Sequence, residues 1–390
     1  MSKFILRHKM FLITVLSLLL IKIVWVTWSC QGNGSFEDEK NDLLQRRNYL
    51  IDKIVVEPRQ LLNNMPSSIG VQFQGEWALY SCSMLAEALS NMTKLYPETK
   101  EESIATIDSL IQIVKSQELR LYDKIRWGED PLESLDGDNS HVSYLSHLSW
   151  MIGNYRKIGG DCRYNHLHDS ICETMNRRIL KSPLLNLPTY PNEPVYVPDM
   201  MVAIVALSDY TRLNNGKYSS TVKDWINRAK SEWIDDKTGL LVSFLDDNGQ
   251  MEAPIKGSYS ALNCYFLTKT DTDFAREQYD KLKAYFRQSF PASGIKEYHD
   301  RSCWLGMDID AGPILLNLSP SGTAFAIGSA TYFNDMKFRI SLLKTAEIAG
   351  HTVKWNKKRH YLLGDIALVG EAITLAMRTN YRIENILYHR

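Results

Sequence analysis

Four short stretches share one pattern: an apolar segment, then a polar turn, then an aromatic residue that opens the next segment. They are GGDCRY at 159–164, NNGKY at 214–218, TDTDF at 270–274 and NDMKF at 334–338. The closing aromatics are 54, 56 and 64 residues apart. Gly, Asn and Asp favour tight turns and can cap a following helix. A repeat of this length, with one apolar segment on each side of a turn, predicts an array of helix pairs.

The first segment of each pair is apolar almost all round, which is typical of a helix buried on every side. We expect six such helices, with starts near Trp77, Tyr144, Met200, Ser258, Ala311 and Ile366. The second segments, such as 101–117 and 273–286, are amphipathic with charged outer faces. The sequence therefore predicts an all-α fold, an (α/α)6 toroid of six inner and six outer helices over residues 41–390. Residues 37–53 would supply the sixth outer helix.

Two structural details stay open at this point. A helical solenoid that does not close is the alternative to a ring. The stretch LLVSFLDDNGQ at 240–250 is the clearest strand-like segment, and we expect it to form a hairpin on a rim.

The N-terminal segment differs from the rest of the chain. Lys3, Arg7, His8 and Lys9 precede an apolar run over 10–28, which is long enough as a helix to span roughly 30 Å of hydrocarbon. Residues 1–30 are therefore predicted to be a signal anchor or transmembrane segment, with a lipoprotein signal ending at Cys30 as the alternative. Residues 31–40 are predicted to be a short flexible linker. The basic flank predicts that the following domain is extracytoplasmic and held at the membrane.

Composition excludes some functions. The 45 basic and 45 acidic residues balance, so no excess positive charge indicates nucleic-acid binding. The 20 Tyr and 9 Trp fit either a large core or an aromatic-lined cleft for a sugar or another small organic ligand. The cysteines after Cys30 are odd in number and lack metal-site spacing. A Cys162–Cys172 disulfide and simple buried thiols remain alternatives. We expect no metal and no cofactor, and oligomeric state is not predicted.

In such a ring the inner helices run parallel, so their N-termini meet at one end, which we call the mouth. Ionisable or hydroxyl side chains stand at every predicted start: Glu76, His141, Tyr144, His147, Asp199, Lys256, Ser258, Asp308, Asp310 and Asp365. We expect Glu76, His147, Asp199, Asp310 and Asp365 to surround one cavity. The alternative for Asp199, Asp310 and Asp365 is an ordinary helix cap.

Three local groups are candidates for chemistry. His141, Tyr144 and His147 have the spacing i, i+3, i+6, and imidazole and phenol groups can transfer protons near neutral pH; the alternative is a pair of core histidines. Asp308 and Asp310 alternate in an extended stretch, where both carboxylates can face the mouth and raise each other's pKa. Trp127 and Glu129 lie in the turn-rich segment RWGEDP, which is either a ligand platform or a surface turn.

With these residues in view, the chain resembles the linalool dehydratase/isomerase family over about 127–290. The similarity is clearest in YLSHLSWMIGNYRKIGGDCRYNHLHDSI at 144–171. The resemblance implies an (α/α)6 toroid and cofactor-independent acid/base chemistry on an alkenol. The pocket histidine of the family falls on His147, and its two pocket cysteines fall on Tyr190 and Asp199. The thiols are therefore not retained.

The leading hypothesis is an exported, membrane-tethered, cofactor-independent acid/base enzyme acting on a hydroxylated small molecule, as a hydro-lyase or isomerase. Its expected catalytic residues are His147, Asp310, Asp199 and Asp308. The expected substrate-binding residues are Tyr144, His141, Glu76, Trp127, Glu129, Tyr190, Lys256 and Asp365. One alternative is a glycan hydrolase, lyase or epimerase with two carboxylates such as Asp199 and Asp310. Another is a non-catalytic toroid that binds a glycan or a lipid.

Overall fold

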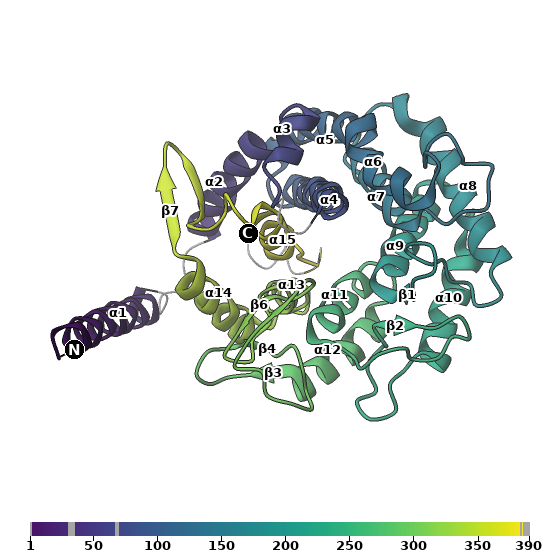
Figure 1. Ribbon diagram of the computed structural model, residues 1–390. Helices are drawn as coiled ribbons and strands as arrows, with labels where there is room; N and C mark the ends of the chain where they lie inside the picture. The colour runs from purple at the N-terminus through teal and green to yellow at the C-terminus, as the bar shows by residue number, and fades with distance from the viewer. Residues whose placement is uncertain (1, 30–35, 67–69, 383, 385–390) are drawn as a thin grey trace.

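The inner wall of the molecule is a closed ring of helices (Figure 1). The computed structural model describes residues 2–29, 36–66, 70–382 and 384. The inner helices are α4 (Val71–Leu95), α7 (Val142–Lys157), α9 (Val197–Leu213), α11 (Gly257–Leu267), α13 (Pro320–Tyr332) and α15 (Leu368–Arg378). Each packs against the next, and α15 packs against α4. The predicted toroid is therefore confirmed, and the open solenoid is excluded.

A second layer of helices backs the ring. Each inner helix is paired with an outer helix: α5 (Lys100–Lys115) with α4, α8 (Asn165–Lys181) with α7, α10 (Ser219–Glu232) with α9, α12 (Thr272–Phe286) with α11, α14 (Met336–Gly350) with α13, and α2 (Phe36–Ile54) with α15. Two shorter helices, α3 (Pro58–Asn63) and α6 (Gln117–Trp127), also pack on α4, as does the turn η1 (Pro97–Thr99). A second turn, η2 (Cys162–Tyr164), precedes α8.

Within the described residues the strands form four small antiparallel pairs. They are β1 (Val195–Tyr196) with β2 (Phe244–Leu245), β3 (Arg287–Gln288) with β4 (Gly294–Ile295), β5 (Leu305–Asp308) with β6 (Gly312–Leu315), and β7 (Thr352–Trp355) with β8 (Lys358–Tyr361). The stretch 240–250 pairs with β1 through Phe244 and Leu245. It also turns back on itself: the Asp246 N–H donates to the Gln250 carbonyl at 2.9 Å, and Leu245 bridges Met251. The expected hairpin is therefore present, and β1 is an additional partner of its first strand.

The repeated turns have the local cause that the sequence suggested. Asp271 accepts a hydrogen bond from the backbone N–H of Phe274 at 2.9 Å, and Asp335 accepts one from Phe338 at 3.2 Å. These side chains cap α12 and α14, where the first N–H groups have no partner in the helix. The aromatic residue after each cap is buried. Each turn therefore folds an outer helix back onto its inner partner.

Two expected boundaries are wrong. The inner helix expected near Ala311 begins at Pro320, because residues 305–315 form the β5–β6 hairpin first, with Gly312 at a φ of 80°. The outer helix expected over 37–53 is present as α2, which begins at Phe36, so the linker expected over 31–40 does not include residues 36–40. Cys162 and Cys172 are both free thiols. Cys30 lies outside the described residues.

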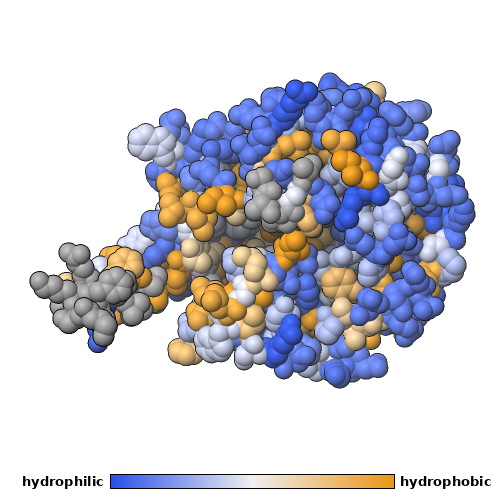
Figure 2. Space-filling view, viewed as in Figure 1, coloured by the Kyte–Doolittle hydropathy of each residue, from blue (hydrophilic) through white to orange (hydrophobic). Residues whose placement is uncertain are grey.

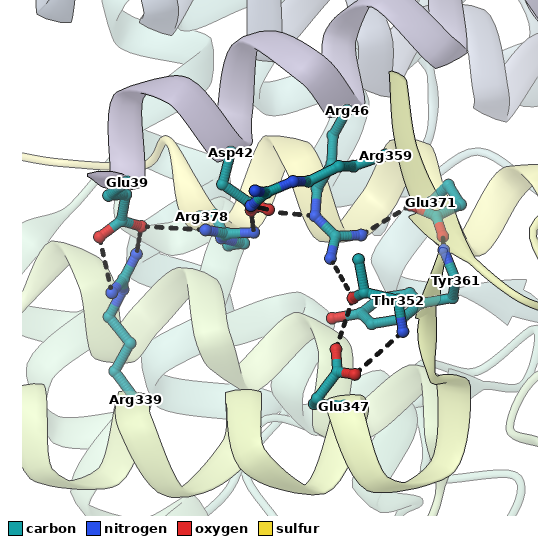
Figure 3. Close-up of polar contacts among 10 residues, drawn as sticks. All are labelled: Glu39, Asp42, Arg46, Arg339, Glu347, Thr352, Arg359, Tyr361, Glu371 and Arg378. Atoms are coloured by element: carbon teal, nitrogen blue, oxygen red, sulfur yellow. Dashed lines mark hydrogen bonds and ion pairs between the residues drawn. The ribbon is translucent and has the colours of Figure 1, made fainter. Parts of the chain in front are cut away.

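Ion pairs join α15, the last inner helix, to the outer helix α2 (Figure 3). We call this set the closure network; its members are Glu39, Asp42, Glu347, Glu371, Arg46, Arg339, Arg359 and Arg378. Asp42 accepts from Arg46 at 3.0 Å and from Arg359 at 2.8 Å, and it also pairs with Arg378. Burial alone would raise the pKa of Asp42, but Arg378 and Arg46 outweigh it and hold that pKa well below its usual range.

The N-terminal helix α1 (Ser2–Ser29) projects from the ring beside α14 (Figure 1). Its segment Lys9–Val26 is long and apolar enough to cross a membrane, by length and composition. Its side chains are largely exposed rather than packed against the toroid.

Candidate active site

Four side chains from three inner helices line a recess at the mouth. Glu76 and Tyr80 come from α4, Asp199 from α9 and Tyr259 from α11. Each of these side chains is partly exposed, although many protein atoms surround it. The open surface therefore faces an internal hollow rather than bulk solvent. Figure 2 shows hydrophobic side chains gathered around the middle of the ring and hydrophilic ones over its periphery.

The two carboxyl groups in the recess have raised proton affinities. Burial raises the pKa of Glu76 to about 8, and the charges of Asp199 and Asp310 add to the effect. A hydrogen bond from the Tyr190 hydroxyl opposes it only in part. Burial also raises the pKa of Asp199 to about 6, against a 2.7 Å hydrogen bond from the Thr189 hydroxyl. At neutral pH Glu76 is therefore mostly protonated and Asp199 mostly ionised.

Lys256 clamps the two aspartates of the β5–β6 hairpin. Its Nζ lies 2.8 Å from an Asp308 oxygen and 3.1 Å from an Asp310 oxygen. Asp308 also accepts the backbone N–H groups of Asp310 and Ala311 at 2.9 and 3.0 Å. Burial would raise the pKa of Asp308, but Lys256 and these N–H groups lower it overall. Asp308 is thus a fixed anion, and its predicted role in proton transfer does not fit its surroundings.

The aromatic ring of Tyr80 separates His147 from the recess. Its ring centroid is 4.6 Å from that of Tyr80, and its Nδ1 is 2.8 Å from the Ser83 hydroxyl. Within the described part of the chain, its Nε2 has no hydrogen-bond partner. Burial lowers the pKa of His147 to about 3, so the imidazole is neutral at physiological pH. It can orient a hydroxyl group, but it is a poor proton donor.

His141 and Tyr144 point elsewhere, although the sequence placed them with His147. A step of three residues turns a helix by about 300°, so each successive side chain is displaced by about 60°. The Tyr144 hydroxyl donates to the Val114 carbonyl of the outer layer at 2.9 Å. His141 lies before α7 and its Nδ1 is 2.5 Å from Asp123. The expectation of one shared helical face is therefore wrong.

The segment around Trp127 forms its own contacts with His141. The Trp127 ring centroid is 5.3 Å from that of His141, and Glu129 lies 3.2 Å from His141 Nε2. Tyr190 belongs to the recess side instead, because its hydroxyl bonds to Glu76 and Arg126 stacks over its ring at 4.0 Å. Trp127 and Glu129 therefore hold a loop beside the recess, and Tyr190 lies at its edge.

Asp365 is the other expected member that the structure separates from the recess. It accepts from the Tyr49 hydroxyl at 2.9 Å and pairs with Lys53 at 2.8 Å, and both partners belong to the outer helix α2. Lys53 lowers the pKa of Asp365. Asp365 therefore secures the loop before α15 to the outer layer.

Sequence reasoning missed three members of the site. Tyr80 lies one helical turn after Glu76, and Tyr259 follows Ser258, so helical spacing alone would have added both. Glu297 carries no such signal: it is fully buried, and it accepts the backbone N–H of Ser258 at 3.1 Å and its hydroxyl at 2.8 Å. Burial raises the pKa of Glu297 to about 7. It positions the start of α11, and with it Lys256.

The placement of possible ligands gives no support to a metal site in the part of the chain that the structure describes. Among the residues that the structure describes, no group of three or more His, Cys, Asp and Glu side chains is arranged to hold one. The site is instead a set of carboxyl groups with different proton affinities, surrounded by phenols.

No protein-family model matches the sequence, and no curated protein matches it either. Similar solved structures include a glycoside hydrolase from family 105 of C. acetobutylicum ATCC 824, with a TM-score of 0.54 and 9% identity over 78% of this chain and 93% of its own. Another is an unsaturated glucuronyl hydrolase specific for heparin, with a TM-score of 0.53 and 12% identity over 86% of this chain and 96% of its own. At these identities the likeness shows the toroid fold alone.

Proposed function

We propose that this protein is a glycan-active hydrolase in which Glu76 is the general acid and Asp199 the general base. The observation that carries the proposal is the pair of carboxyl groups on two inner helices, α4 and α9, with pKa values of about 8 and about 6 in one recess. Two titratable groups whose surroundings separate their pKa values are the usual signature of an acid/base pair. The similar solved structures, both glycoside-cleaving enzymes on this fold, support a saccharide substrate.

The roles follow from the protonation states. Protonated Glu76 donates its proton to the glycosidic oxygen as the bond to the sugar carbon breaks. Ionised Asp199 removes a proton from the attacking water, whose oxygen forms the new bond to that carbon. Asp310, fixed by Lys256, keeps a negative charge near both groups and so supports the high pKa of Glu76.

The alkenol chemistry implied by the family resemblance would use the same acid and base, without the thiols of that family. The solved structures favour the glycan-active alternative over it. His147, first expected to be catalytic, becomes in this proposal a positioning residue that orients Tyr80 and a ligand hydroxyl.

The test is turnover by matched variants. Glu76→Gln and Asp199→Asn are expected to lower kcat/KM on a panel of oligosaccharides by about 10²–10⁴-fold. Asp365→Asn is the control, because it removes a carboxylate near an inner-helix start but outside the recess. Turnover of linalool is measured separately. Turnover of linalool without cleavage of any oligosaccharide would replace this proposal with the hydro-lyase reading.

The location of the domain is a second part of the proposal. We propose that α1 anchors the protein in a membrane and that the toroid is extracytoplasmic, on the strength of the basic flank and the exposed apolar segment Lys9–Val26. Alkaline phosphatase fused after residue 390 is expected to be active. A fluorescent cytoplasmic reporter at the same place, with an inactive phosphatase, would contradict this topology.

A further inference from the structure

We infer that the recess accepts a neutral or amine-bearing saccharide and rejects a uronate. This inference rests on the proposed function and adds the class of substrate to it. The charges that surround Glu76 and Asp199 determine which sugars the recess can hold.

The cations that act on this site, within the described residues, are already engaged by carboxylates. Lys256 lies within 3.1 Å of both Asp308 and Asp310. Arg126 lies 3.0 Å from Glu193 and stacks over Tyr190. A substrate carboxylate would have to displace one of these carboxylates to gain a charged partner.

Acidic groups outnumber those two cations. Asp199, Asp308, Asp310 and Glu193 are carboxylates around the recess, even when Glu76 is counted as neutral. A further anion would meet like charges in a poorly solvated site, where such repulsion is much stronger than in water. An ammonium group would instead gain Asp199 and Asp310 as partners.

Helix N-termini carry partial positive charge and could in principle bind an anion. At the two starts nearest Lys256, however, the backbone donors are occupied. The N–H of Ser258 donates to Glu297 at 3.1 Å, and that of Gly322 donates to the Ser319 hydroxyl at 3.1 Å. These helix starts therefore have their first donors saturated by the chain itself.

The remaining polar groups suit hydroxyls and amines. Nε2 of His147 is an unpartnered nitrogen, within the described chain, on a side chain that is 2% exposed. Its ring packs on Tyr80, whose pKa is raised by burial and by the nearby Asp199 and Glu76. A neutral imidazole and a neutral phenol offer hydrogen bonds to a sugar hydroxyl without adding charge.

The charge of the substrate also limits the reaction. Elimination in a uronate breaks the C5–H bond, which is acidic because of the adjacent carboxylate. A sugar without that carboxylate lacks the activation, so the glycosidic bond must be cleaved by water. Substrate charge and the hydrolytic assignment therefore support each other.

The experiment compares binding of matched tetrasaccharides to the full chain in detergent. Glu76→Gln prevents turnover while keeping the uncharged state of the group, and titration calorimetry measures Kd. The probes are β-1,4 tetramers of glucose, glucosamine and glucuronate, together with α-1,4 tetramers of galactose, galactosamine and galacturonate. We expect the neutral or amine-bearing tetramer of at least one backbone to bind at least tenfold more tightly than its uronate.

A second variant tests the cause. Asp310→Asn is expected to weaken binding of the amine-bearing tetramer and to strengthen that of the uronate, whereas Asp365→Asn leaves both unchanged. Tightest binding by a uronate would overturn the inference and leave the proposed glycan hydrolase standing. Failure of all six tetramers to bind, with no turnover by the wild-type protein, would overturn the proposed function and the inference together.

Discussion

Removing the Asp42 carboxylate from the closure network is expected to destabilise the ring strongly. Asp42 sits between three guanidinium groups, with Arg46 at 3.0 Å and Arg359 at 2.8 Å, and Arg378 in direct contact. The side chains of Arg46 and Arg378 are only 4% and 9% exposed. Asp42→Asn leaves these charges buried without their main partner, and breaking a buried pair in this way costs about 3–5 kcal/mol.

The assay is urea unfolding of the full chain in detergent, followed by far-ultraviolet circular dichroism. Asp365→Asn is the matched control, because its ion pair with Lys53 has exposures of 39% and 57% and is expected to contribute at most about 1 kcal/mol. The folded pKa of Asp42 is depressed, so its contribution is present above an unfolded pKa of about 3.9 and is lost as pH falls through the folded value. The difference between wild type and Asp42→Asn should therefore shrink below about pH 4. A loss at pH 7 no larger than that of the control would refute the assignment of ring closure to this network.

Three further predictions concern the recess and a tyrosine that lies outside it. The dependence of kcat/KM on pH should be bell-shaped between about 6 and 8, because Asp199 must be ionised and Glu76 protonated. Asp310→Asn removes a negative neighbour of both groups, so it should move both limbs of this profile to lower pH. Rates measured on a cleaved oligosaccharide at a series of pH values would show the shift. His147→Gln should raise KM several-fold with kcat retained within about tenfold, whereas a loss of about 10²-fold or more in kcat would return proton transfer to this residue. Tyr144→Phe should leave turnover unchanged and lower the free energy of unfolding by about 1–3 kcal/mol, because the Val114 carbonyl loses its hydrogen-bond donor. Impaired turnover with an unchanged free energy of unfolding would place Tyr144 in the site.

The ring could be predicted from the sequence because its determinants are local. Asp271 and Asp335 cap the helices that follow them, and apolar residues cover the inner helices all round. The closure network could not be predicted, because Asp42 and Arg378 are 336 residues apart and nothing local marks their contact. The start of α13 was misplaced for a related reason: residues 305–315 are apolar enough for a buried helix, but Gly312 turns them into a hairpin.

The site was only partly predictable. Parallel inner helices bring their first turns together, and this placed Glu76, Asp199, Lys256 and Asp310 correctly at one mouth. Which way each side chain faces depends on a few tens of degrees of helix rotation, which sequence spacing does not resolve. Asp365 accordingly turns to the outer layer, where it bonds to Tyr49. Glu297 comes from a loop between α12 and α13, and only the tertiary structure brings it beside Ser258.

Basic residues lie in the last turns of four inner helices, whereas the acidic site lies at the end where these helices begin. They are Lys94, Arg156, Lys157, Arg212 and Arg378. At the end where the inner helices finish, Lys157 pairs with Asp209 at 2.8 Å and Lys269 with Glu87 at 2.5 Å. Cations are favourable near helix C-termini and carboxylates near N-termini, because each helix carries partial charges of opposite sign at its ends. Acidic side chains at the mouth are therefore compatible with the stability of the fold. Burial raises the pKa of Glu76 and of Asp199 where the helix ends alone would lower both, and this suits the two groups to the proposed proton transfers. A variant that opens the recess to water, such as Tyr80→Ala, should lower the pKa of Glu76 and that of Asp199 and reduce the difference between the two values. The pH profile of that variant would show it as a shift of the basic limb below 8, and an unchanged basic limb would mean that burial does not set the proton affinity of Glu76.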